Sequence, residues 1–295
     1  MMNGVVNIIK PAGMSSSDVV ARMRRILGQK RVGHLGTLDP AAAGVLPILV
    51  GKATRLFDYL SMHNKEYIAE FCLGAETDTL DAEGTVTERL PWDGDAARLS
   101  SALDAFTGVI DQVPPQYSAV KLGGRKAYDL ARKGECASMP VRQVAIHRLE
   151  LMRVEGDRAW VRIECEKGTY VRSLCRDIAR AVGTRGYLTY LLRTQSGAYR
   201  LEDGLTLAQA AVLAARGCLP VEPMEDAVAF LPALSVAADR ERGLRNGLRP
   251  PLAALPQHPH VRVYCGGAFF GIGHGQIGER GPELKLDLYL PPEEA

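Results

Sequence analysis

The stretch GHLGTLDPAAAGVLPILVGKATR, residues 33–55, contains a single acidic residue, Asp39. Glycines at positions 33, 36 and 44 and prolines at positions 40 and 47 predict a rigid, tightly folded loop around this carboxylate. A residue before proline favours an extended backbone, which would aim the Asp39 side chain outward. Asp-Pro is also an ordinary turn pair, so residue type alone does not separate a catalytic acid from a turn.

The length and composition predict a globular protein with one large domain or two unequal ones. The chain has 295 residues, 46% of them hydrophobic, and no apolar run approaches the ~20 residues that span a bilayer. The first residues, MMNGVVNIIKPAG, lack the charged-then-apolar order of a signal peptide, so we expect a cytoplasmic protein without membrane contact. None of the six cysteines has C-x-x-C or zinc-finger spacing, which predicts buried, reduced thiols and no structural metal.

The net charge of +2 is unevenly distributed along the chain. Residues 1–70 contain nine basic and five acidic residues, and residues 151–200 contain ten basic and five acidic residues. The segments 71–150 and 201–295 are acidic. If the fold brings the two basic segments together, they would form the electropositive surface that a polyanion needs; the alternative is ordinary solvated surface charge.

Strand and helix patterns alternate along the chain, which predicts an α+β fold. Ser15 to Gly28 is typical of a helix, with serines at its start and arginines on one face, and residues 171–183 predict another. Residues 147–168 predict two strands around a Gly156-Asp157 turn. The remaining expected elements are a strand at 67–73 and helices at 98–106, 125–132 and 207–216. After residue 232 short strand patterns broken by glycine and proline predict a small β-rich second domain.

Several familiar site motifs are excluded by spacing. Gly51-Lys52 lacks the glycine spacing of a phosphate-binding loop, and Ala53 stands where Ser or Thr would hold magnesium. GIGHG from Gly271 and ETDTLDAEG from Glu76 are better explained as turns than as a dinucleotide or calcium site. His258 and His260 lie in a proline-broken loop without other ligands, and no G-x-S-x-G nucleophile motif occurs.

Four motifs together resemble the TruB-type tRNA pseudouridine-55 synthase family. They are NIIKPAGMSS near the start, the Asp39 loop, NKEYIAEFCLGAETDTLDAEG after it and KGTYVRSLCRDIA later, and their kind, order and spacing agree with the family. The resemblance implies a pseudouridine-synthase-type mixed, largely antiparallel sheet flanked by helices, as the catalytic domain, residues 1–232. Residues 233–295 resemble more weakly the small PUA-like RNA-binding domain of such enzymes.

The resemblance also implies roles for individual residues. Asp39 matches the family's catalytic aspartate, Tyr67 its motif tyrosine and Arg172 the arginine of its G-T-Y-[IV]-R motif. His34 matches a histidine that fills space near the flipped bases, and Leu191 a leucine that closes over the uracil. The pair Lys10-Pro11 matches the K-P pair at the N-terminal edge. Leu35 and Ile9 depart from the residue types that the family usually has there.

The chemistry that the resemblance implies suits these residues. Conversion of uridine to pseudouridine breaks the bond between ribose C1′ and uracil N1 and rejoins the retained base through C5, so one carboxylate suffices. Asp39 would attack C1′ or C6, or assist a glycal route, while Arg172 keeps it ionised and Tyr67 stacks on the base or moves a proton. Because a stacked base is out of reach, the enzyme must extrude it.

The resulting prediction is a monomeric tRNA pseudouridine synthase that acts on the T stem-loop without a metal, an organic cofactor or a protein partner. RNA phosphates would be bound by a basic cluster of five residues: Arg22, Arg24, Arg25, Lys30 and Arg31. Two alternatives remain at this stage. One is a guide-RNA-dependent pseudouridine synthase of the dyskerin type, and the other is a non-catalytic chaperone that folds tRNA with the same surface.

Overall fold

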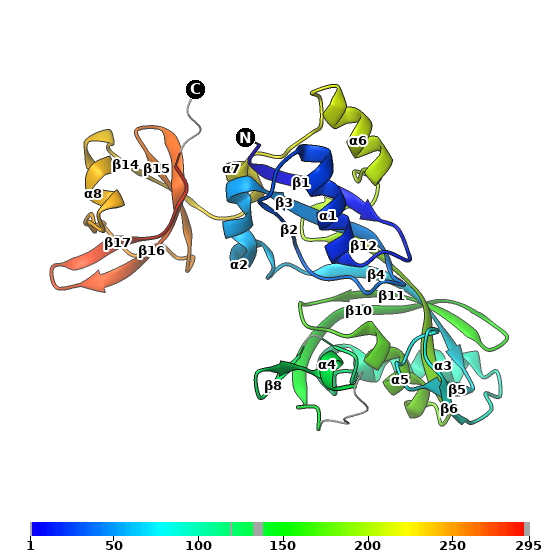
Figure 1. Ribbon diagram of the computed structural model, residues 1–295. Coiled ribbons are helices and arrows are strands. Elements are labelled where there is room, and N and C mark those ends of the chain that lie inside the picture. The colour runs from blue at the N-terminus through cyan, green and yellow to red at the C-terminus, as the bar shows by residue number, and fades with distance from the viewer. Residues whose placement is uncertain (1, 119, 132–137, 292–295) are drawn as a thin grey trace.

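The computed structural model describes residues 2–118, 120–131 and 138–291, and its centre is a long, curved sheet (Figure 1). Seven strands of this nine-stranded sheet follow one another in space: β1 (Gly4–Lys10), β3 (Ala43–Val50), β12 (Gly186–Ser196), β4 (Lys65–Leu73), β11 (Arg158–Cys165), β10 (Arg142–Glu155) and β7 (Gly108–Gln112). Two short strands, β2 (Val32–His34) and β13 (Tyr199–Arg200), pair with β3 and β12. Only the β3–β12 pairing in this path is parallel. The predicted mixed, largely antiparallel sheet is confirmed.

The alternating sequence of the central strands decides which face of the sheet is buried. In β4, KEYIAEFCL, every second residue from Lys65 to Leu73 is buried and the residues between them are half-exposed. Strand β11 alternates in the same way because side chains of neighbouring strand residues point to opposite faces. The buried face carries Tyr67, Ala69 and Phe71, which join a core cluster with Leu174 and Ile178 of the helix that covers them.

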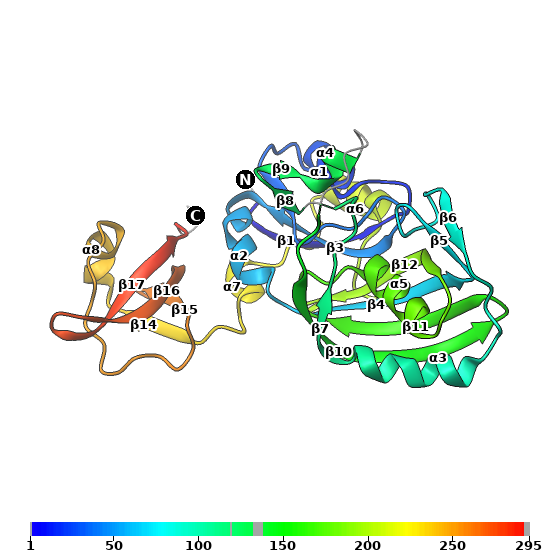
Figure 2. The same ribbon diagram turned by 90° about the horizontal axis from the view of Figure 1, so that it is seen from below.

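Helices cover this face, and other helices pack against the end of the sheet that β1 and β3 form (Figures 1 and 2). The longer ones are α1 (Ser16–Leu27), α3 (Ala96–Leu103), α5 (Val171–Ala181) and α6 (Leu207–Ala215), and α2 (Phe57–Leu60) and α7 (Met224–Ala227) are single turns. Helix α1 has the predicted caps: Ser15 and Asp18 form a capping box, and Gly28 adopts a left-handed backbone with φ +59° at the C-terminus. None of the helices in the described ranges is both long and apolar enough to cross a membrane.

One predicted helix is partly wrong. At residues 125–132 the helix α4 is confined to Ala127–Ala131, and Arg125–Lys126 forms strand β9, which pairs with β8 (Lys121–Leu122). The reason is the Gly123-Gly124 pair, whose φ values of +56° and +85° suit a two-residue hairpin turn. Residue 132 lies outside the described residues. A second hairpin, β5 (Ala75–Thr77) with β6 (Val86–Arg89), contains the turn expected in ETDTLDAEG.

A second sheet of four strands begins at Ala233. Its order is β14 (Ala233–Val236), β15 (Val261–Cys265), β16 (Ala268–Gly278) and β17 (Gly281–Tyr289), with a short helix α8 (Glu241–Arg245) beside it. Figure 1 shows this sheet set apart from the large one. Near its end, Arg55 donates a 2.6 Å hydrogen bond to the Tyr289 carbonyl and Lys52 a 3.0 Å bond to the Pro291 carbonyl. Lys52, excluded above as a phosphate-loop lysine, therefore holds the C-terminal segment.

The cysteines follow their expected chemistry in part. Cys165, Cys175 and Cys265 are buried free thiols, and burial raises the pKa of Cys165 to about 11. Cys72 is half-buried. Cys218 is exposed, so its predicted burial is wrong; it follows the C-terminus of α6, where the chain turns at Gly217. Cys136 lies outside the described residues.

Candidate active site

The loop that carries Asp39 joins β2 to β3 and is fixed from several sides. The buried side chains of Leu38 and Ala42, on either side of Asp39, anchor it in the core. The hydroxyl of Ser16, at the start of α1, donates to the Leu38 carbonyl at 3.0 Å and accepts from the Leu38 amide at 2.9 Å. The Asp39 side chain itself stays 44% exposed. The loop is therefore rigid while its carboxylate is presented outward, as the sequence predicts.

Arg172 lies beside this carboxylate in the first turn of α5. Its Nη2 is 2.9 Å from Asp39 Oδ2, and its side chain is only 7% exposed. The same guanidinium donates to the Thr79 carbonyl at 3.0 Å and to the Tyr117 carbonyl at 2.9 Å. A buried guanidinium with fixed acceptors is a directed, always-charged partner for a carboxylate, so the arrangement keeps Asp39 oriented.

Asp81 is a second carboxylate at Arg172 that the sequence reasoning did not single out. Its Oδ2 lies 3.4 Å from Arg172 Nη1, and its Oδ1 accepts a 2.6 Å hydrogen bond from the Thr79 hydroxyl. Leu80, between them, has φ +62°, a left-handed backbone that is strained for leucine. The strained turn directs both the Thr79 carbonyl and the Asp81 carboxylate to Arg172. The Asp-x-x-Asp spacing of Asp78 and Asp81 is ordinary in a turn and did not indicate this contact.

Tyr67 and Leu191 come from adjacent strands under the same loop. Tyr67 is buried on β4, and Leu191 on β12 pairs in register with Ala69, two residues further along β4. Both belong to the core cluster that includes Leu38 of the Asp39 loop. The structure thus brings together Asp39, Arg172, Tyr67 and Leu191 from a loop, a helix and two strands. Burial raises the pKa of Tyr67, so the phenol keeps its proton near neutral pH.

Sequence comparisons agree with this arrangement. Residues 24–171 match the TruB family pseudouridylate synthase (N terminal domain). The tRNA pseudouridine synthase B of Moorella thermoacetica is 43% identical over 278 residues, which cover 90% of this chain and 91% of that protein. That of Thermobifida fusca is 46% identical over 259 residues, with coverages of 84% and 87%. This chain belongs to the TruB family.

Solved structures show the same fold as this TruB-family chain. A chain in the crystal structure of a Cbf5-Nop10-Gar1 complex is 26% identical, with a TM-score of 0.73 over 98% of this chain and 85% of that one. A chain in the structure of an H/ACA RNP bound to a substrate RNA containing 2′-deoxyuridine has a TM-score of 0.72 at 24% identity, with coverages of 98% and 85%. The expected α+β fold with a C-terminal β unit is confirmed.

His34 ends β2, next to the catalytic loop of the TruB-family chain. Its ring is largely shielded, and its Nδ1 atom is buried without a hydrogen-bond partner among the described residues. Burial lowers the pKa of His34, and the positive charge of Arg193 lowers it further, so the ring is neutral at pH 7. A neutral ring suits the predicted role of filling space beside a displaced base.

Lys10 was predicted to contact the substrate, and its position corrects this prediction. The residue is 0% exposed at the end of β1. Its ammonium group donates to three backbone carbonyls, those of Pro11, Met14 and Pro40, the last at 3.0 Å. Pro40 directly follows Asp39. All three donors of the ammonium group are used inside the protein. Lys10 therefore supports the Asp39 loop instead of binding RNA.

The buried ammonium of Lys10 predicts a pH effect on catalysis. Burial lowers the pKa of Lys10 to about 8, so the group is charged below pH 8 and neutral above it. A neutral amine has two N–H donors for the three carbonyls, which loosens the loop. We therefore expect kcat to be constant up to about pH 7.5 and to fall severalfold by pH 9.5, measured with tRNA in excess.

Variants test whether Lys10 causes this alkaline decrease. Lys10→Met cannot titrate, so its rate should be lower by about tenfold and the decrease centred near pH 8 should vanish. Lys65 is the matched control because burial also lowers its pKa to about 8, and its ammonium donates to the Ser61 carbonyl at 2.9 Å, away from the loop. Lys65→Met should keep the decrease. A Lys10→Met profile as steep as that of the wild type would contradict the prediction.

The five predicted phosphate-binding residues all lie at the surface of α1 and the segment after it: Arg22, Arg24, Arg25, Lys30 and Arg31. Two of them also stabilise the protein, because Arg24 donates to the Val32 carbonyl at 3.0 Å and Arg31 to the Thr54 hydroxyl at 2.8 Å. Arg24 lies about 12 Å along the helix axis from Ser16, which touches the catalytic loop. RNA binding by this cluster stays a prediction.

Leu35, which departs from the family, is buried in the core.

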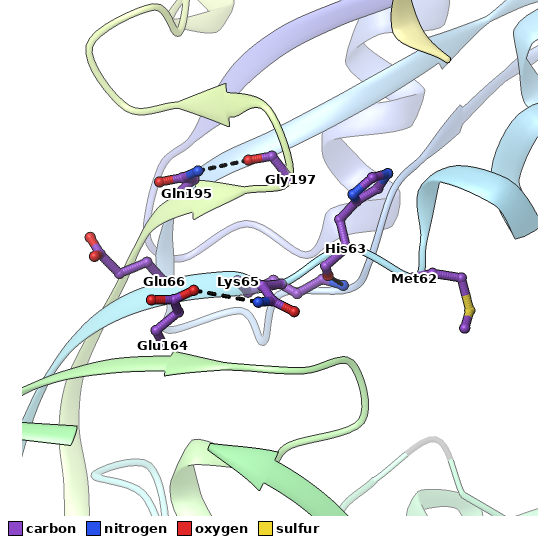
Figure 3. Close-up of a pocket in the computed structure, with 8 residues that line it drawn as sticks. Met62, His63, Lys65, Glu66, Glu164, Gln195 and Gly197 are labelled. Carbon is purple, nitrogen blue, oxygen red and sulfur yellow. Dashed lines mark hydrogen bonds between the residues drawn. The ribbon is translucent and has the colours of Figure 1, made fainter. Parts of the chain in front are cut away.

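A polar hollow at the ends of β4, β11 and β12 has neither Asp39 nor Arg172 in its lining. It has a volume of about 460 Å³ and is lined by Met62, His63, Asn64, Lys65, Glu66, Glu164, Gln195 and Gly197 (Figure 3). Glu66 and Glu164 give it two carboxylates, and Asn64 donates to Glu164 at 3.4 Å. Two carboxylates repel phosphate, so this hollow does not suit an RNA backbone.

Among the described residues no group of three His, Cys, Asp or Glu side chains could hold a metal.

Proposed function

We propose that this protein is a stand-alone tRNA pseudouridine synthase that isomerises the uridine at position 55 in the T loop. The observation that carries the proposal is the 2.9 Å ion pair between Asp39 and the buried Arg172, which orients one carboxylate. Tyr67 lies in the same core cluster as Leu38 of the Asp39 loop. The relatives named tRNA pseudouridine synthase B, at 43% and 46% identity, support tRNA as the substrate.

The proposed chemistry assigns a task to each of these three side chains. Asp39 is the nucleophile or charge stabiliser at the uridine after the base has left the stack. Arg172 holds the carboxylate in place. The phenol of Tyr67, protonated at neutral pH, stacks on the uracil. After the C1′–C5 bond has formed, it takes part in the transfer of the C5 proton to solvent, which restores the uracil ring.

The proposal extends to the organisation of the chain. We propose that residues 1–232 form the catalytic domain and that residues 233–295 form a PUA-like domain that makes an auxiliary RNA contact. The latter segment contains seven basic and seven acidic residues, which supports a secondary role in binding phosphates. We further propose a cytoplasmic monomer that needs no protein partner.

One experiment separates this function from its two alternatives. Purified protein is incubated with an unmodified tRNA transcript, without guide RNA or metal, and pseudouridine is mapped by carbodiimide treatment and primer extension. We expect a single stop at the T-loop uridine. A tRNA without modification would contradict the proposal, and modification that appears only after addition of a guide RNA would favour the dyskerin-type alternative. Restored tRNA folding without any modification would favour the chaperone.

A further inference from the structure

Arg193 is a buried cation that lies between the strands of the two central site residues. It is 1% exposed on β12, where its register partners are Gly44 on β3, just after the catalytic loop, and Tyr67 on β4. Gly44 allows this close approach, because a Cβ atom there would lie 2.2 Å from the Arg193 carbonyl oxygen. Backbone and side chain of Arg193 are therefore both packed against the site.

The side chain of Arg193 ties together the two ends of the Asp39 loop. Its Nε donates a 2.7 Å hydrogen bond to the Val45 carbonyl, and its Nη2 donates a 3.1 Å bond to the Gly36 carbonyl. One of these acceptors precedes Asp39 and the other follows it. Gly36 itself has φ +84°, so the loop turns sharply at the point where the guanidinium holds it. The planar guanidinium of Arg193 thus fixes the distance between the two ends of the loop.

The same guanidinium acts on Tyr67. Burial raises the pKa of Tyr67, and the charge of Arg193 and a hydrogen bond from it oppose that rise. Arginine has no acceptor atom, so in any hydrogen bond between the two side chains Arg193 is the donor and the phenol oxygen the acceptor. Arg193 and Tyr67 are register partners on adjacent strands. The guanidinium that holds the loop therefore also lies beside the Tyr67 side chain.

A purely structural role would not require a charge at this position. No carboxylate among the described residues forms an ion pair with Arg193, although the side chain is almost completely shielded from water. Burying a cation without a counter-ion is unfavourable, and an apolar side chain of similar volume would be more stable there. Buried, electrostatically strained groups of this kind concentrate at functional sites.

We propose that Arg193 is a positioning residue of the reaction: it fixes the Asp39 loop and aims the Tyr67 hydroxyl at the extruded uracil. This inference rests on the proposed function, because it concerns the same site. Arg193 acts through Asp39 and Tyr67 and does not touch the substrate. Its loss should therefore slow the chemical step while leaving tRNA binding intact.

The test compares Arg193→Lys with the wild type. Lysine keeps the positive charge but not the planar fork, so the protein is expected to fold, which thermal unfolding checks. Single-turnover rates are measured by tritium release from tRNA labelled at uracil C5, and tRNA affinity by filter binding. We expect the rate to fall about 100-fold and the Kd to change less than about threefold. Thr194→Val is the control, because Thr194 bonds to Glu66 at 2.7 Å on the other face of β12, and its rate should stay within about twofold.

A double-mutant cycle with Tyr67→Phe tests the coupling to the phenol. If Arg193 aims the hydroxyl, Arg193→Lys should cost less than about tenfold in the Tyr67→Phe background. If the rate losses of Arg193→Lys and Tyr67→Phe simply multiplied in the double variant, the proposed coupling between the two residues would be wrong. An Arg193→Lys protein with the wild-type rate, or with a loss that merely tracks weaker tRNA binding or a smaller folded fraction, would overturn the inference alone. A wild-type protein that releases no tritium from tRNA would overturn the proposed function itself.

Discussion

Replacement of Asp39 by asparagine should abolish pseudouridine formation, with a fall in the single-turnover rate on the order of 10⁴-fold or more. Asparagine has nearly the same shape, and the loop is held by the Leu38 backbone and the Pro40 carbonyl, which the substitution leaves unchanged. The anionic oxygen that the loop presents is lost, and with it the group that we propose attacks or stabilises the sugar. Tritium release from C5-labelled tRNA measures the rate.

Two control measurements distinguish loss of the Asp39 carboxylate from a general effect of the substitution on the protein. Asp58→Asn, which changes an exposed acid on α2, should release tritium at the wild-type rate. Affinity of Asp39→Asn for tRNA should remain within a few-fold of the wild type, because phosphate contacts supply most of the binding free energy. A variant that keeps more than about 1% of the wild-type rate would contradict the role of Asp39. Absence of tritium release from both the wild type and Asp39→Asn, together with unchanged tRNA folding by both, would favour the chaperone function.

Local sequence rules predicted much of the fold because they depend on neighbouring residues. The Ser15 cap and Gly28 fixed the ends of α1, and the turn at Gly156-Asp157 separates β10 from β11 as expected. The hairpin at Gly123-Gly124 follows an equally local rule, but the helical pattern that continues from it into α4 concealed it. The order of strands in the sheet depends on contacts between distant segments, and no local pattern specifies these.

The candidate site was predictable only in part. Glycine and proline spacing indicated a rigid loop at Asp39, but its pairing with Arg172 was implied by the family resemblance and not by any local pattern. Arg193 was missed because its acceptors are backbone carbonyls, which every residue carries. Lys10 was misjudged for the same reason: a lysine beside a proline gives no sign that three carbonyls surround it.

Burial of charged side chains also changes the interpretation of the basic excess in residues 151–200. Residues 151–200 carry ten basic residues, which predicted an electropositive surface. Two of them, Arg172 and Arg193, are buried at the site and add positive potential around Asp39 from inside the protein. Buried charges of one sign act over short distances with little screening by solvent. Part of the basic excess therefore lies in the interior near Asp39 and not at the surface.

Substitution of Arg172 by lysine should lower kcat on the order of 100-fold with little change in KM. The guanidinium reaches Asp39, Asp81 and the carbonyls of Thr79 and Tyr117 at the same time. Lysine keeps the charge, but its donors all start from one nitrogen, which cannot span the separate acceptors that Nη1 and Nη2 of Arg172 reach. The Asp39 carboxylate then loses its fixed direction although it keeps a nearby cation.

A control on the same helix distinguishes this effect from a general loss of α5. Arg180 forms an ion pair with Glu76 at 2.7 Å, and eight residues of helix place it about 12 Å from Arg172 along the axis. Arg180→Lys should therefore keep kcat within about twofold. If Arg172→Lys also stayed within twofold, a diffuse positive charge would suffice at Asp39. The directed hydrogen bonds would then be structural, and the geometry of the ion pair would not limit the reaction.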